Sequence, residues 1–426
     1  MPNFPHSPFL WLAVEKDGTP KDPNVISKIS AALDAAQATD LVFMSHGWKN
    51  DEAAAEALYR ELWDNTGSLL GAKAARTVVV GVQWPAARYP KRLAAETSEA
   101  AAAGGVQSMT AGHAEPGDIT DGDFDAELGQ LLGFLKPNDQ VLKTAAVAWS
   151  KTRQQDDADT IFARGNIARV ASVDPELSKD MVKLPTQAGL RQQALVRMQD
   201  EPSRGAASGG VQDLQDVLFG WTRGPKSAVI KVLEQFSFYE MKARAGTVGA
   251  VLGNALESAR PTAMVKLHLV GHSFGARLVT AFAKTFDATE RIELFSLTLL
   301  QGAYSHSGLS VTRHGAFATV AGRPTGPISI THTHNDKACF GIYAWATRLS
   351  GDTTQAIGDK NDAFGAMGAN GAQDCQAIEV SASSGFAPES GKITNYRADA
   401  YIKDHGDVRN PVIGRLLAAA IQAPLE

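Results

Sequence analysis

The chain has 426 residues, of which 44% are hydrophobic and 20% are charged, and this is enough to bury a large core in one big domain with an insertion or in two domains. Its formal net charge of −5 gives no electrostatic reason to expect nucleic acid or an acidic membrane surface as a partner.

The N-terminal segment is a poor signal peptide, because it has no basic n-region and Pro5, Pro8 and Glu15 interrupt its apolar run. No apolar segment of the sequence approaches the ~20 residues that a membrane-spanning helix needs. We therefore expect a cytoplasmic protein without an integral membrane segment. Cys339 and Cys375 are the only cysteines, and the sequence leaves open whether they pair.

Strand and helix patterns alternate in the first 89 residues. Residues 9–14 and 41–44 are short apolar runs, and 77–83 (TVVVGVQ) is rich in β-branched residues, which is typical of a strand buried on both faces. Between these runs, 24–38 and 51–63 repeat apolar residues at helical spacing. The pattern predicts three strands connected by two helices.

The character of the sequence changes at Pro90. Residues 94–123 are rich in Ala, Gly and Ser with little periodicity, and only helical patterns follow as far as Gly224. We interpret 90–224 as a mainly helical insertion or cap. It would separate the two parts of one core, 1–89 and 225–426.

The alternation returns after the insertion. Strands that alternate with helices over most of the length predict an α/β fold, with a mostly parallel sheet and helices on both of its faces. After a long helix or helix pair at 225–256, the expected strands are 265–270, 294–300, 328–334, 376–380 and 395–402, and the expected helices are 276–284, 340–349 and 411–421.

The most informative stretch is Gly271-His272-Ser273-Phe274-Gly275, where a strand pattern ends and a helical pattern begins. This is the G-x-S-x-G pattern of a nucleophile elbow. Its two glycines leave room for neighbouring backbone to pass close to a strained serine. The helix that follows supplies N–H groups and the positive end of its dipole, which favour an oxyanion beside Ser273.

Further polar residues follow other expected strands. The carboxyl ends of parallel strands lie on one edge of a sheet, so Ser273, Asp336 and His405 can converge although they are far apart in sequence. A histidine within reach takes the proton of a serine hydroxyl, and a buried carboxylate fixes the tautomer of that histidine. The competing acids lie in the irregular loop after Asp336 and are Asp352, Asp359, Asp362 and Asp374.

This chain order of nucleophile, acid and histidine resembles the α/β-hydrolase superfamily, over about 41–85 and 225–421. The phrases FMSHGW, VQWP, GHSFGARL and DHGD are most similar to a group of bacterial serine hydrolases with poorly defined substrates. The resemblance implies an α/β-hydrolase fold, with Ser273 as nucleophile, His405 as base and Asp336 as the carboxylate. It also implies that the backbone N–H groups of Trp48 and Phe274 form an oxyanion hole.

We therefore expect a serine hydrolase that cleaves a carboxylic ester in a small-molecule or lipid-like acyl substrate through an acyl-enzyme on Ser273, without a metal or other cofactor. Amide or carbamate hydrolysis by the same triad is an alternative, because these reactions share a tetrahedral oxyanion. A protein of this fold that binds without turnover is an alternative of another class. The acyl and leaving groups and the oligomeric state stay open.

A zinc hydrolase is a minor alternative. The run His332-Thr333-His334-Asn335-Asp336 is an H-x-H-x-D pattern, which places His332, His334 and Asp336 on one face of a strand. Lys337 follows where zinc hydrolases of this kind have another histidine, and the serine elbow would have no role. A chelator distinguishes the two readings, because only the zinc enzyme would lose activity on chelation.

Overall fold

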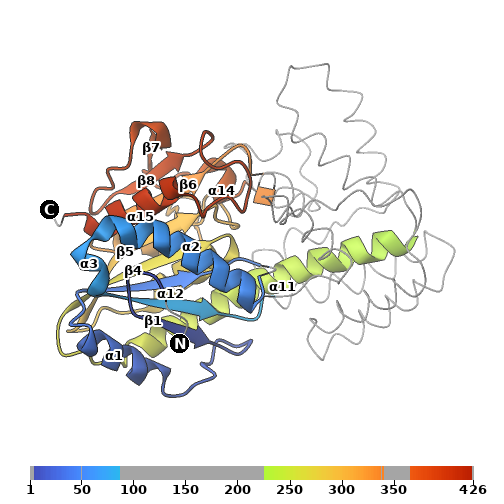
Figure 1. Cartoon of the computed structure of the whole chain (residues 1–426). Coiled ribbons are helices and arrows are strands. Elements are labelled where there is room, and N and C mark those ends of the chain that lie inside the picture. The colour runs from blue at the N-terminus through green and yellow to red at the C-terminus, as the bar shows by residue number, and fades with distance from the viewer. Residues whose placement is uncertain (1–3, 49, 87–224, 337, 340–364, 425–426) are drawn as a thin grey trace. The chain divides into compact units, whose positions relative to one another are not determined.

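The computed structural model describes residues 4–48, 50–86, 225–336, 338–339 and 365–424, and for 225–240 it describes the backbone but not the side chains. These residues include an eight-stranded parallel β-sheet (Figure 1). The chain divides into two compact units, of which the first comprises Met1–Arg88, Arg244–Phe340 and Gly358–Glu426. The second comprises Tyr89–Ala243 and Gly341–Ile357. The predicted insertion at 90–224 and the predicted helix at 340–349 lie outside the described residues.

The sheet has the order β1-β3-β2-β4-β5-β6-β8-β7, and every neighbouring pair of strands is parallel. The prediction of an α/β fold with a parallel sheet is therefore confirmed. The strands are β1 (Phe9–Ala13), β2 (Asp40–Ser45), β3 (Thr77–Gln83), β4 (Val265–His272), β5 (Ile292–Leu300), β6 (Ile328–His332), β7 (Ile378–Ser381) and β8 (Ile393–Arg397).

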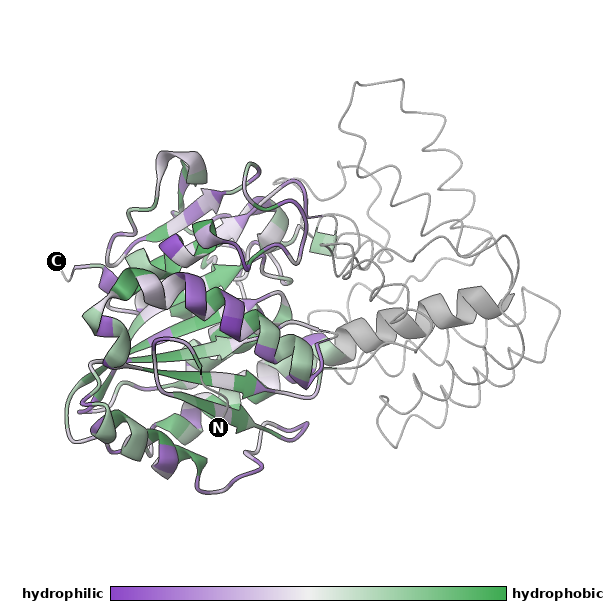
Figure 2. Cartoon of the chain, viewed as in Figure 1, coloured by the Kyte–Doolittle hydropathy of each residue, from purple (hydrophilic) through white to green (hydrophobic). Residues whose placement is uncertain are grey.

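The central strands are buried on both faces because helices cover the sheet on either side. Figure 2 shows these strands mostly in the hydrophobic colour, as expected for strands with no solvent-facing side. The described helices are α1 (Val25–Ala35), α2 (Glu52–Leu70), α3 (Ala72–Ala75), α11 (Pro225–Leu256), α12 (Phe274–Thr285), α14 (Met367–Asn370) and α15 (Pro411–Gln422), with short 3₁₀ turns at Ala318–Gly322 and Ala382–Ser384.

Residues 225–256 form one continuous helix, which decides between the single helix and the helix pair that the sequence allowed. The C-terminal part of α11 packs against α12, and the contact depends on small residues. A side chain on Gly249 would collide with the carbonyl group of Leu278, and one on Gly253 would meet Thr285 and the carbonyl group of Phe282. Among the described residues, no helix is long and apolar enough to cross a membrane.

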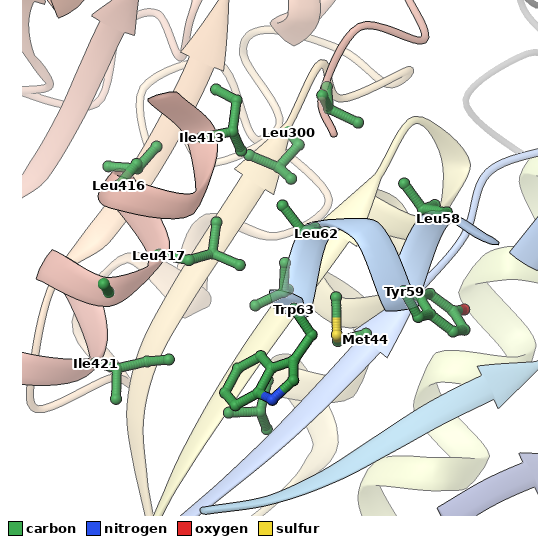
Figure 3. Packing of buried hydrophobic residues seen from close by; sticks show 14 of the residues in the cluster. Met44, Leu58, Tyr59, Leu62, Trp63, Leu300, Ile413, Leu416, Leu417 and Ile421 are labelled. Carbon is green, nitrogen blue, oxygen red and sulfur yellow. The ribbon is translucent and has the colours of Figure 1, made fainter. Parts of the chain in front are cut away.

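Helices α2 and α15 pack side by side on one face of the sheet and bury a cluster of apolar side chains there (Figure 3). Both helices begin with a side-chain cap, since Asp51 accepts the N–H of Ala54 and Asn410 accepts those of Val412 and Ile413. The labelled members of the cluster are Met44, Leu58, Tyr59, Leu62, Trp63, Leu300, Ile413, Leu416, Leu417 and Ile421.

Truncating Leu417 to alanine tests this core. The side chain is fully buried between α15 and the sheet, so Leu417→Ala should lower the free energy of unfolding by about 2–5 kcal/mol through lost burial and the cavity left behind. Leu69→Ala is the matched control, because Leu69 is 47% exposed and its loss should change stability by less than about 0.5 kcal/mol. Denaturant unfolding of both variants measures the difference, and equal effects would contradict the described packing.

Candidate active site

Ser273 lies at a sharp turn between the end of β4 and the start of α12. Its backbone has φ 59° and ψ −123°, a left-handed conformation that is strained for a residue with a side chain. Two hydrogen bonds hold it there. Ser273 N–H donates to Leu300 O at the end of β5 (3.0 Å), and Ala303 N–H, just after β5, donates to Ser273 O (3.2 Å). The turn is therefore imposed by neighbouring backbone.

The glycines on either side of Ser273 are required by close approach of the main chain. A Cβ on Gly271 would collide with the carbonyl group of Gly275, and a Cβ on Gly275 would collide with the carbonyl groups of Ser45 and His46 at the end of β2. Any larger residue would push β2 and the elbow apart. The spacing of the G-x-S-x-G pattern thus follows from how tightly α12 sits on β2 and β4.

The loop after β2 passes directly beside Ser273. A Cβ on Gly47 would lie 2.6 Å from Cβ of Ser273, so only glycine fits there. Trp48 follows in this loop, and its ring lies 6.1 Å from that of Phe274. The structure therefore places both predicted oxyanion-hole residues next to the serine, and the role of their N–H groups stays a prediction.

His46 holds this loop in place through hydrogen bonds of its backbone and its ring. Its N–H donates to the hydroxyl of Tyr59 (2.7 Å), its Nδ1 donates to Gly47 O (2.8 Å), and its carbonyl accepts the indole N–H of Trp84 (3.0 Å). The imidazole also stacks on Trp84 at 5.6 Å. Burial lowers the pKa of His46 to about 4, so the ring is neutral at neutral pH and has a structural part in the loop.

Ser273, His405 and Asp336 form one hydrogen-bonded chain. Ser273 Oγ lies 2.8 Å from His405 Nε2, and His405 Nδ1 lies 2.8 Å from Asp336 Oδ2. The carboxylate assigns the proton to Nδ1, which leaves Nε2 as an acceptor for the hydroxyl of Ser273. The three predicted catalytic side chains thus meet at the carboxyl edge of the sheet, after β4, β6 and β8.

The carboxylate of Asp336 is completely buried and each of its oxygens has partners. Oδ1 accepts the backbone N–H of Cys339 (2.8 Å), and Oδ2 accepts both His405 and the side-chain amide of Gln301 (3.1 Å). The amide of Gln301 is itself oriented, because its Oε1 accepts the hydroxyl of Thr331 (3.0 Å). These donors compensate for the loss of water around a buried charge.

His405 is held through its backbone by His272, the residue before the serine. His272 Nε2 donates to His405 O at 2.7 Å. Burial, and then the charge that His405 can carry, lower the pKa of His272 to about 3, so its ring stays neutral and keeps this donor. The elbow therefore positions the base as well as the nucleophile.

Asp399 ties the loop of the acid to the segment that leads to the histidine. Its carboxylate accepts the hydroxyl of Thr333 (2.9 Å) and the N–H of His334 (3.0 Å), and the amide of Asn335 donates to Asp399 O (2.9 Å) and Ile402 O (2.8 Å). Asp336 and His405 therefore lie on two loops that are hydrogen-bonded to each other.

The structure does not bring His332, His334 and Asp336 together. His332 Nε2 bonds to Glu379 (2.7 Å), and His334 Nδ1 lies 3.3 Å from Asp399. Both histidines line a cavity of about 630 Å³ near β7 and β8, whose lining does not include Asp336. The zinc site that the H-x-H-x-D run suggested is therefore not formed, because alternate residues here continue into a turn and diverge.

A second Ser-His-Asp chain lies inside the sheet. His268 Nδ1 is 2.8 Å from Ser296 Oγ, and His268 Nε2 is 3.0 Å from Asp40 Oδ1. Lys73 Nζ lies 3.1 Å from the same carboxylate oxygen. The three residues are buried, Ser296 in β5, His268 in β4 and Asp40 at the start of β2. This chain therefore links three strands and has no access to a substrate.

Several residues that support the site were missed by the sequence reasoning. Gln301 and Asp399 come directly after β5 and soon after β8, so the rule that polar residues after parallel strands converge could have found them. Cys339 carried no such signal. Cys339 and Cys375 are both free thiols, which answers the question of their pairing. Of the competing acids, Asp374 pairs with Arg313, and the other three lie outside the described residues.

Comparison with known protein families, with curated proteins and with solved structures found no match to this chain. Its function is therefore inferred from its own residues and their geometry.

Replacing Gly275 with alanine tests the close approach at the elbow. The added Cβ would collide with the carbonyl groups of Ser45 and His46, so Gly275→Ala should cost at least about 1–3 kcal/mol of stability and displace Ser273. Gly322→Ala is the control, because nothing lies within 4 Å of a Cβ there. Denaturant unfolding measures both variants, and unchanged stability of Gly275→Ala would contradict the geometry.

Protonation of His46 should make the fold less stable in mild acid. Its folded pKa of about 4 lies below the ordinary value of about 6.5, so between these pH values the unfolded chain binds a proton that the folded chain does not. The free energy of unfolding should therefore fall as pH falls through this window, by up to about 1.4 kcal/mol per pH unit from this residue.

Urea unfolding at about pH 7.5 and about pH 5 measures the effect. His46→Asn, whose amide can replace the Nδ1 donor, should reduce the difference between the two pH values. A difference as large as that of the wild type would show that other groups cause the acid sensitivity.

Proposed function

We propose that this protein is a serine hydrolase of the α/β-hydrolase type that cleaves a carboxylic ester through an acyl-enzyme on Ser273. The observation that carries the proposal is the hydrogen-bonded chain from Ser273 through His405 to Asp336, at 2.8 Å for each step. The chain order of nucleophile, acid and histidine, each after its own parallel strand, supports the α/β-hydrolase assignment.

The serine would act as nucleophile with the histidine as its base. As Ser273 Oγ attacks the ester carbonyl, His405 Nε2 takes the hydroxyl proton, and the buried carboxylate of Asp336 stabilises the imidazolium that forms. The negative charge that develops on the carbonyl oxygen needs donors. The N–H groups of Phe274, at the N-terminus of α12, and of Trp48 are the proposed ones.

The reaction would then proceed in two halves. His405 gives its proton to the leaving alkoxide, which departs as an alcohol and leaves the acyl group on Ser273. A water molecule next loses a proton to His405 and attacks the acyl carbon. As the second tetrahedral intermediate collapses, His405 returns that proton to Ser273 Oγ and the carboxylic acid is released. No step requires a metal ion or another cofactor.

The strain at Ser273 supports a functional role for this residue. Left-handed backbone at a residue other than glycine persists only where the surroundings impose it, and such positions are concentrated at active sites. Ser296 provides the contrast, since it lies within strand β5 beside a shift in register with β4, has no positive φ, and is hydrogen-bonded to a fully buried histidine. Two serines with similar partners, 5% and 2% exposed, thus differ in backbone conformation and in position, since only Ser273 lies at the carboxyl edge of the sheet.

The two serines allow a matched test of the proposal. Ser273→Ala should lower hydrolysis of a p-nitrophenyl ester by about 10⁴-fold or more and abolish labelling by a fluorophosphonate probe. Ser296→Ala should keep both and lose only about 1–3 kcal/mol of stability, because His268 Nδ1 loses its partner.

Labelling that survives in Ser273→Ala, or its loss in a folded Ser296→Ala, would overturn the assignment of the nucleophile. A wild-type protein that neither labels nor cleaves any ester of a graded chain-length series would instead indicate a binding protein of this fold.

A further inference from the structure

The thiol of Cys339 lies against the acid and histidine of the proposed triad, yet serine chemistry has no use for it. Its Sγ is 3.8 Å from His405 Nδ1, and its backbone N–H donates to Asp336 Oδ1. The residue is 1% exposed and does not form a disulfide. A buried thiol, a carboxylate and an imidazole therefore share one small space.

These three groups have the spacing of a metal site. One ligand atom each from Asp336, Cys339 and His405 lie within 4.8 Å of one another, and among the described residues they are the only such group of three. Zinc bonds of about 2.3 Å to sulfur and about 2.0 Å to nitrogen at a tetrahedral angle separate the two ligands by roughly 3.5 Å. The 3.8 Å between Sγ and Nδ1 already fits this arrangement.

The charges of the cluster also fit a divalent cation. A thiolate and a carboxylate together balance the two positive charges of Zn²⁺, so the occupied site would be neutral overall, which matters where water is excluded. The carboxylate is oriented by donors from Gln301 and from the backbone of Cys339, and such outer partners strengthen metal binding. The 2.8 Å separation between His405 Nδ1 and Asp336 Oδ2 must open, by roughly 0.5 Å, and the thiol must give up its contacts of 3.7 Å with the carbonyl oxygens of Gln301 and Gly302.

We propose that Asp336, Cys339 and His405 form an inhibitory site for Zn²⁺. Binding replaces the hydrogen bond between His405 and Asp336 by bonds from the ion to Nδ1, to a carboxylate oxygen and to the thiolate of Cys339. The thiol proton leaves to solvent, and the proton of Nδ1 moves to Nε2 because the imidazole stays neutral.

Inhibition follows from this change of tautomer. With its proton on Nε2, His405 donates to Ser273 Oγ and can no longer accept the hydroxyl proton, so the general base is lost after only a small shift between His405 and Asp336. This consequence rests on the proposed hydrolase function, whereas the binding of zinc does not. The effect of zinc on activity is opposite to that in a zinc hydrolase, since here added zinc would remove activity and chelation would restore it.

Direct binding tests the site independently of any activity. Calorimetric titration of the full chain with Zn²⁺ should show a site that Cys339→Ala weakens by more than about tenfold, whereas Cys375→Ala, which removes the other thiol, should bind as the wild type does. Co²⁺ in place of zinc should give a thiolate charge-transfer absorption that Cys339→Ala lacks. Thermal unfolding checks that each variant is folded.

Inhibition is measured separately, as the loss of fluorophosphonate labelling of Ser273 with rising zinc and its return on chelation. Zinc that binds wild type and a folded Cys339→Ala equally well, or no zinc binding at all, overturns the site. Zinc bound through Cys339 in a protein that never labels would retain the site and reject the hydrolase function. Labelling that is unaffected at saturating zinc would reject inhibition.

Discussion

The geometry of the site depends on how closely three backbone segments approach one another around Ser273. Gly271, Gly275 and Gly47 are each in contact with backbone or with the serine where a Cβ would collide. These contacts pack the end of β2, the end of β4 and the start of α12 directly against one another. The left-handed conformation of Ser273 is a consequence of that packing, so the position of its hydroxyl at the carboxyl edge of the sheet is decided by the fold as a whole.

The sequence predicted the parts of this arrangement that depend on local pattern. The β-branched run 77–83 coincides with β3 at both ends. A strand buried on both faces is a continuous apolar run, so its ends are easy to locate in the sequence. Asp336 and His405 were found because each follows an expected element at the carboxyl edge. Helix α2 extends seven residues beyond the predicted end at 63, since its last turns are stabilised by packing on α15 that no local signal shows.

The partners of the site were harder to predict, because they depend on contacts between residues far apart in the chain. Cys339 meets His405 across 66 positions, and His268 meets Asp40 across 228. Residue types alone would have assigned the second Ser-His-Asp chain the same chemistry as the first. Backbone conformation and position in the sheet separate them, and neither can be derived from residue types alone.

The linkage between the loops after β6 and β8 has a consequence for how the protein would fail. The strand β7 is short and mostly exposed, and it is the edge strand beside β8 in the described sheet. Because Asp399 and Asn335 join the two loops, fraying of this margin would carry the acid and the base away from the serine together. The central strands and the elbow would stay folded, so the geometry of the triad would be lost before the fold itself.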